Sequence, residues 1–136
     1  MAVGLTGRNA AKVLVVDDEA DVRELVRVVL LREGFEVATR PATDLLLSRL
    51  PAIKPDVIIL DVHMPMEDGG KFLRRLRCIE QFAGIRVLMM SGRPVTAEEW
   101  DSYRDLGAVE FVRKPFDIND LVGRVRRLLE PSAADA

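Results

Sequence analysis

The chain has 136 residues, of which 49% are hydrophobic, so it is long enough for one domain with a full core. The net charge is −2 at pH 7, which argues against a protein that binds nucleic acid or a membrane surface through bulk charge. Cys78 is the only cysteine, which excludes an intrachain disulfide and a cysteine metal cluster and favours a reducing, cytoplasmic compartment.

Strand-like and helix-like patterns alternate five times along the sequence. An apolar run at 12–16 predicts the first strand, and apolar residues at helical spacing predict a helix after it that Gly34 ends. The second strand is expected at 35–38. The next helix is expected to have Pro41 in its first turn, to end before Pro51, and to use three leucines for packing: Leu45, Leu46 and Leu50.

The second half of the sequence repeats this alternation. Strands are expected at 56–60, 85–90 and 108–112, and a helix over 67–80 follows the first of them. Thr96 and Glu99 have the spacing of a capping box at the start of the fourth helix. Asp117 is expected to cap the last helix, whose apolar residues should face inward: Ile118, Leu121, Val122, Val125, Leu128 and Leu129.

This alternation predicts an α/β fold, a doubly wound (βα)5 three-layer sandwich of flavodoxin-like type. The strands at 12–16, 56–60 and 85–90 are nearly pure apolar runs, as strands buried on both faces should be. The other two strands carry Glu36 and Glu110, which edge strands tolerate. The expected order of the parallel sheet is therefore 2-1-3-4-5. Residues 12–130 form the expected domain, with a loose arm at 1–11 and a tail or truncated linker at 131–136.

Polar side chains follow four of the five predicted strands. Because parallel strands end at one edge of their sheet, five side chains should meet there: Asp17, Asp18, Asp61, Ser91 and Lys114. Three crowded carboxylates repel one another unless a cation is present, and oxygen ligands favour Mg²⁺ or Mn²⁺. The lysine and the hydroxyl suit a phosphoryl group, and no P-loop is present to hold a nucleotide. Asp61 is the candidate nucleophile, since carboxylates form aspartyl phosphates.

These motifs resemble the receiver domain of the two-component response regulators. The acidic pair is Asp17-Asp18, and the run 61–65 with Gly69 eight residues after Asp61 is similar to the phosphoacceptor loop. Ser91-Gly92 and the sequence Lys-Pro-Phe at 114–116 complete the pattern, over about residues 12–130. Each motif alone is weak, but all four in order are specific.

The resemblance implies a role for each site residue. Asp61 would accept a phosphoryl group from a histidine kinase or phosphotransfer protein. Asp18, Asp61 and the backbone carbonyl of His63 would hold Mg²⁺, with Asp17 helping directly or through water. Lys114 and Ser91 would contact the phosphoryl oxygens, and Phe111 would move as the aromatic switch. The Lys114–Pro115 bond would be cis, and His63 and Arg93 would tune the lifetime of the phosphate.

The resemblance also implies partners. The face of the fourth helix, fifth strand and fifth helix would signal to an output domain or partner protein, and a phosphorylation-dependent homodimer is an open alternative. No direct contact with nucleic acid or membrane is expected. The chain would be no enzyme beyond transfer to itself and its own dephosphorylation.

Two other functions compete with this interpretation. A small-molecule phosphatase with an aspartyl-phosphate intermediate often carries a second acid two residues after the nucleophile, but His63 stands there and no cap domain is evident. A flavin-binding module of similar topology needs a phosphate loop rich in hydroxyl groups and glycine after the first strand, where residues 17–19 are acidic.

Overall fold

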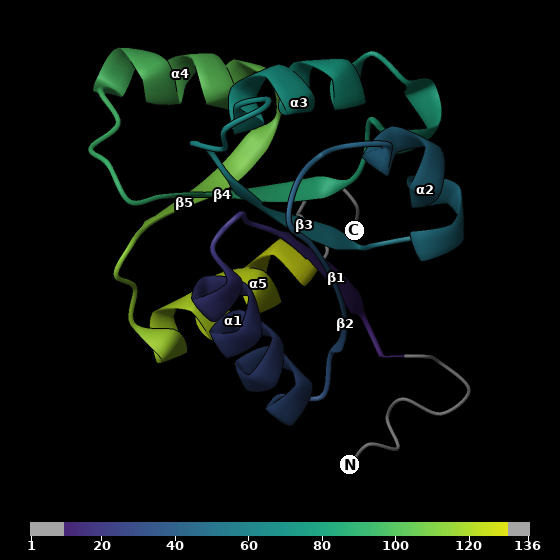
Figure 1. The fold of residues 1–136 in the computed structure, drawn as a ribbon, viewed down its shortest axis with the longest axis vertical. Helices are drawn as coiled ribbons and strands as arrows, with labels where there is room; N and C mark the ends of the chain where they lie inside the picture. Colours follow the sequence, from purple (N-terminus) through teal and green to yellow (C-terminus); the bar gives the residue numbers. More distant parts are fainter. Residues whose placement is uncertain (1–9, 131–136) are drawn as a thin grey trace.

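The computed structural model describes residues 10–130 as a five-stranded parallel sheet between two helical layers (Figure 1). The predicted tail at 131–136, and the predicted arm up to residue 9, lie outside the described residues. The strands are β1 (Lys12–Val16), β2 (Glu36–Arg40), β3 (Val57–Asp61), β4 (Arg86–Ser91) and β5 (Ala108–Arg113). The helices are α1 (Ala20–Arg32), α2 (Leu46–Ile53), α3 (Gly69–Arg77), α4 (Ala97–Asp105) and α5 (Ile118–Leu129), with a short 3-10 helix at Glu80–Phe82.

The sheet has the predicted order β2-β1-β3-β4-β5, with every neighbouring pair parallel. β3 is buried along its whole length, and β2 at the edge is only partly buried. The central position of β3 places its last residue, Asp61, between the carboxyl ends of β1 and β4.

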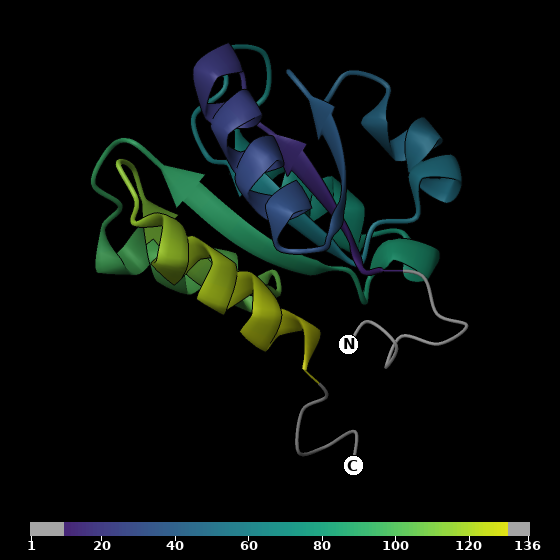
Figure 2. The same cartoon turned by 90° about the horizontal axis from the view of Figure 1, so that it is seen from below.

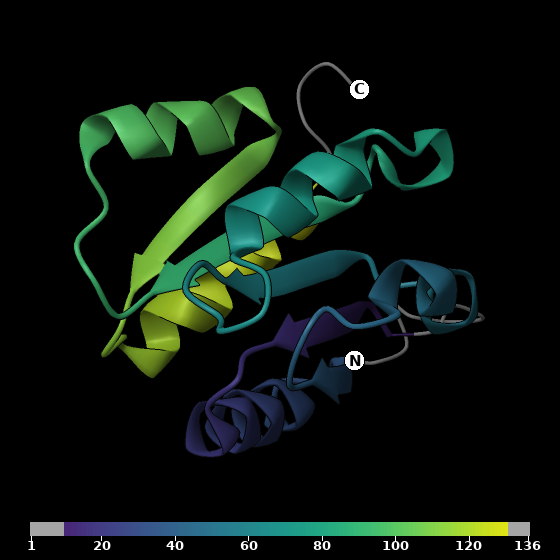
Figure 3. The same ribbon diagram turned by 45° about the horizontal axis from the view of Figure 1, so that its top comes forward.

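The two faces of the sheet carry separate cores. Alternate residues of the central strands, such as Val13 and Ile59, pack with α1 and α5 on one face. Their neighbours, such as Leu14 and Ile58, pack with α2 and α3 on the other, where α4 also lies. Figure 2 shows α1 and α5 together on their face, and Figure 3 shows α2, α3 and α4 on theirs. Because helices cover both faces of the sheet, loops form the edge at the carboxyl ends of the strands. The polar residues of the predicted site lie at this edge.

The helix ends follow the expected caps in most places. The capping box of α4 is confirmed in both directions, since Glu99 N–H donates to Thr96 Oγ1 at 3.1 Å and Thr96 N–H donates to Glu99 Oε1 at 3.0 Å. Asp117 caps α5 by accepting from the Asp120 N–H at 3.0 Å. Among residues 10–130, no helix combines the length and the apolar character that crossing a membrane demands.

The predicted bounds of the second helix are wrong. Residues 41–45 form a loop, and α2 begins only at Leu46, after Leu45 in a left-handed conformation with φ of 57° and a side chain that is 72% exposed. Pro51 lies inside α2 rather than after it. Burial of Leu50 and Ile53 on the sheet holds this last turn, although proline removes one backbone hydrogen bond.

Two smaller predictions are also wrong. The third helix was expected to run to residue 80 but ends at Arg77, and the chain turns at Cys78 before the 3-10 helix. Ile118 was expected to face inward, yet its side chain is 41% exposed. Ile118 is the first helical residue after the Asp117 cap, and the buried stripe of α5 starts only at Leu121.

Candidate functional site

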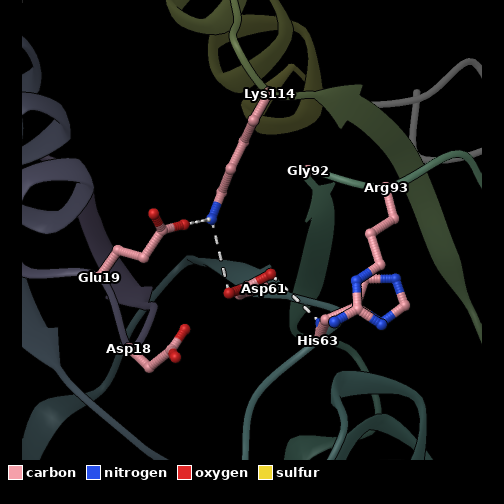
Figure 4. A pocket seen from close by; sticks show the side chains of 7 residues that line it. All are labelled: Asp18, Glu19, Asp61, His63, Gly92, Arg93 and Lys114. Carbon is pink, nitrogen blue, oxygen red and sulfur yellow. Dashed lines mark hydrogen bonds and ion pairs between the residues drawn. The ribbon is translucent and has the colours of Figure 1, made fainter.

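The carboxyl ends of the strands surround a polar pocket of about 180 Å³ (Figure 4). Its lining comes from four segments far apart in the sequence: the loop after β1, the end of β3 with the β3–α3 loop, the β4–α4 loop and the first residue after β5. The lining residues are Asp18, Glu19, Asp61, His63, Gly92, Arg93 and Lys114. The buried side chains of Asp17 and Ser91 lie behind them at the ends of β1 and β4.

Lys114 is the centre of the charge arrangement. Its Nζ lies 2.8 Å from Asp17 Oδ2, 2.7 Å from Glu19 Oε1 and 3.5 Å from Asp61 Oδ2. Figure 4 shows the ammonium between Glu19 and Asp61. Burial acts to lower the pKa of Lys114, but its pairing with Asp17 and Glu19 outweighs this and raises the pKa. Lys114 therefore stays protonated and offers a fixed positive charge to an anion at Asp61.

The surroundings of Asp61 disfavour the charged form of its carboxylate. Its side chain is 4% exposed, and burial followed by repulsion from Asp17 raises its pKa to about 7. Lys114 and the backbone N–H of His63, which donates to Asp61 Oδ1 at 3.2 Å, oppose this rise. Asp61 thus loses its proton near neutral pH, and a cation in the pocket would favour the charged form.

Glu19, which was not among the predicted metal ligands, joins the predicted acids at this edge of the sheet. Carboxylate oxygens of Asp17, Glu19 and Asp61 lie within 4.8 Å of one another, whereas Asp18 lines the pocket from an exposed position. In the sequence, Glu19 was considered only as part of the acidic run 17–19 after the first strand. Its position directly after the acidic pair was the one sequence feature that could have pointed to a role in the site. The contact between its carboxylate and Lys114 is seen only in the structure.

The donor set fits a hard divalent cation. The ligands on offer are carboxylate oxygens, which Mg²⁺ and Mn²⁺ prefer. Asp17 Oδ2 is buried and, apart from the charge contact with Lys114, has no hydrogen-bond partner among residues 10–130, so it has a free electron pair for a cation. Lys114 contacts the same three acids, so it and a metal ion would share them.

Ser91 and Phe111 both have partners other than Asp61 in this structure. The Ser91 hydroxyl donates to the Arg93 carbonyl at 2.7 Å and accepts from the Arg93 N–H at 3.0 Å, so it makes no bond to Asp61. Phe111 is half-buried and packs against Trp100 of α4 in a tilted arrangement, with ring centroids 5.6 Å apart and an interplanar angle of 44°. The Lys114–Pro115 peptide bond is cis.

The loop after Asp61 is held close to the strand end. Gly69 N–H donates to the Val62 carbonyl at 2.8 Å, and a Cβ on Gly69 would lie 2.5 Å from the Asp61 carbonyl oxygen. Only glycine allows this approach. The buried Thr43 hydroxyl donates to Glu67 at 2.7 Å, and Arg75 donates twice to the same carboxylate, which ties the β2–α2 loop to this one.

Comparisons with known proteins agree with this geometry. The family model of the response regulator receiver domain matches residues 13–126. The phosphate regulon transcriptional regulatory protein PhoB of Escherichia coli K12 is 34% identical over 131 residues, which cover 93% of this chain and 56% of PhoB. The transcriptional regulatory protein PrrA of Mycobacterium tuberculosis is 34% identical over 131 residues, with 96% of this chain and 55% of PrrA covered. The chain thus spans just over half the length of these relatives.

Solved structures give the same result for the fold. The Vibrio cholerae chemotaxis protein CheY4 superposes with a TM-score of 0.82 at 32% identity, covering 88% of this chain and 99% of CheY4. A response regulator from Chloroflexus aurantiacus gives a TM-score of 0.81 at 28% identity over 89% of this chain. The parallel sheet, the polar edge and the family match together show that the chain belongs to the receiver domains of the two-component response regulators.

Proposed function

We propose that Asp61 accepts a phosphoryl group in a reaction that depends on Mg²⁺ or Mn²⁺, and that this transfer controls the shape of the domain. The observation that carries the proposal is the pairing of a buried carboxylate with a fixed ammonium in an open pocket: Asp61 Oδ2 lies 3.5 Å from Lys114 Nζ. Such a site suits phosphoryl transfer, which needs a positioned nucleophile and positive charge around the phosphoryl oxygens.

The proposed donor is a histidine kinase or phosphotransfer protein in the cytoplasm. The bond from phosphorus to the donor's histidine nitrogen breaks, and a bond from phosphorus to an Asp61 carboxylate oxygen forms. An apolar pocket of about 390 Å³ between α1 and the β5–α5 loop opens beside the first and shares Glu19, Gly92 and Lys114 with it. A donor protein bound there would bring its phosphohistidine near Asp61.

A bound Mg²⁺ would neutralise charge on the phosphoryl oxygens during transfer. Asp17, Asp18, Asp61 and the backbone carbonyl of His63 would hold it. Lys114 would pair with a phosphoryl oxygen in place of its contacts with the acids, because the new group adds roughly −1.5 to −2 charge at this point.

The proposed switch runs from Ser91 to the face of α4, β5 and α5. Ser91 exchanges its bonds with Arg93 for a phosphoryl oxygen, and Phe111 leaves its contact with Trp100 for the vacated space. α4 has no buried residue and packs on the core through the partly buried Trp100 and Tyr103, so a shift of α4 would disturb few contacts. The changed face would contact an output domain or partner protein, or a second copy of the chain.

Receiver domains are typically not enzymes in the usual sense. The only reactions proposed for this chain are phosphoryl transfer to Asp61 and the later hydrolysis of the aspartyl phosphate. His63 and Arg93 line the pocket mouth and would tune that hydrolysis by controlling the access of water. Exchanging both for alanine is expected to change the decay rate of phosphorylated protein. An unchanged decay rate would reject this role.

The test of the function is incubation with acetyl phosphate and Mg²⁺, followed by intact mass spectrometry. Wild type is expected to gain the mass of one phosphoryl group, and Asp61→Asn to gain none. Addition of a chelator should stop the reaction. Equal labelling of Asp61→Asn, or rapid turnover of many phosphate esters without protein labelling, would contradict the proposal.

A further inference from the structure

Glu19 has a role in the site that the acidic pair and the other motifs do not include. It is the N-cap residue of α1, yet its side chain makes no capping hydrogen bond. A residue at this position commonly turns its side chain to the first N–H groups of the helix. The Glu19 carboxylate instead lies 2.7 Å from Lys114 Nζ, the shortest of that ammonium's three contacts with acids.

The backbone holds Glu19 in place for this contact. Its N–H donates to Asp17 Oδ1 at 2.8 Å, and its carbonyl accepts the first helical bond from the Arg23 N–H at 3.1 Å. The side chain, 60% exposed, then extends over the pocket toward Lys114, whose own side chain is only 12% exposed. Figure 4 shows Glu19 and Asp61 approaching the ammonium from different sides.

The distances indicate which partner Lys114 would have to leave. Lys114 Nζ is 3.5 Å from Asp61 and must approach any phosphoryl group placed there, while it is held at 2.7 Å by Glu19 and at 2.8 Å by Asp17. Asp17 is fully buried at the end of β1, so its contact is fixed by the fold. Glu19 has a long, exposed side chain, so its contact is the one that can open.

Building on the proposed function, we infer that Glu19 is a positioning residue that holds Lys114 away from Asp61 in the unphosphorylated protein and competes with the phosphoryl group for that ammonium. Its release accompanies phosphoryl transfer. The contact therefore slows phosphorylation, and its loss lets Lys114 reach the phosphoryl oxygens more readily.

The first test is lysine labelling in metal-free protein without any phosphoryl donor. Lys114 in Glu19→Gln should react faster with an acylating reagent than in wild type, measured against the exposed Lys71 in the same sample. The difference should shrink at high salt, because partly exposed ion pairs are screened. Unchanged Lys114 labelling would overturn the inference.

The second test is the rate of phosphorylation by acetyl phosphate and Mg²⁺. Glu19→Gln is expected to react roughly two- to fivefold faster than wild type, the range that an exposed ion pair can contribute. Asp21→Asn is the matched control, because it removes one exposed acid from the first turn of α1 and is expected to leave the rate unchanged. Glu19→Ala repeats the test should the glutamine variant fold poorly.

The inference would also be overturned if Glu19→Gln were phosphorylated at the same rate as Asp21→Asn. A rate below that of wild type would overturn it as well, because Glu19 would then promote the transfer. The two proposals fail in distinguishable ways. If wild type takes up no phosphoryl group, the proposed function is wrong, while the labelling test still decides whether Glu19 holds Lys114.

Discussion

Replacement of Asp61 by asparagine should stabilise the metal-free protein, and increasingly so as the pH rises. The asparagine keeps the shape of the side chain but cannot become charged. In wild type, burial and the Asp17 carboxylate raise the pKa of Asp61 to about 7 from the ordinary 3.8. Between these two values the folded chain keeps a proton that the unfolded chain releases, so wild type loses stability as the pH rises through this window.

The size of the effect follows from the same two values. The gap between 3.8 and about 7 corresponds to at most about 4.5 kcal/mol, at ~1.4 kcal/mol for each pH unit. The pocket is open to solvent, which screens the charges around Asp61, so we expect about 2 kcal/mol. Against a total stability of about 5–15 kcal/mol for a typical domain, this loss is measurable.

The assay is urea unfolding followed by circular dichroism at several pH values from 4 to 8, with a chelator present. The stability of Asp61→Asn minus that of wild type should grow through this range and level off above pH 7. Asp105→Asn, which removes an exposed acid at the end of α4, should run parallel to wild type. Parallel curves for Asp61→Asn as well would refute the reasoning that burial disfavours the charged form.

Further substitutions test the loop and the caps. Gly69→Ala should cost about 1–3 kcal/mol in urea unfolding, because its Cβ would meet the Asp61 carbonyl at 2.5 Å. Gly123→Ala in α5 should instead raise the stability by about 0.5–1 kcal/mol, since a Cβ there meets nothing within 4 Å. If both glycine substitutions changed the stability in the same direction, this reasoning would be contradicted. Thr96→Ala should lower stability by about 1 kcal/mol through loss of the capping box, and an unchanged midpoint would mean that α4 needs no cap.

Much of the fold was predictable because its signals are local. The apolar runs, the glutamates of β2 and β5, and the caps at Thr96 and Asp117 each depend on residues close in sequence, and they led to the correct strand order. The second helix was predicted wrongly because tertiary packing decided it. Leu46, Leu50 and Ile53 are buried on the sheet, which overrides the local preference of proline to end a helix.

The sequence by itself determined which residue types stand at the strand ends, and with the parallel topology this was enough to bring Asp61, Ser91 and Lys114 to one edge. It could not determine which acids approach the ammonium, because side-chain reach depends on how α1 sits over the sheet. The tertiary structure alone brought Glu19 to Lys114 and left Asp18 at the exposed wall of the pocket. The physical reason is that burial and charge pairing depend on distances between atoms in space. These distances cannot be read from the spacing of residues along the chain.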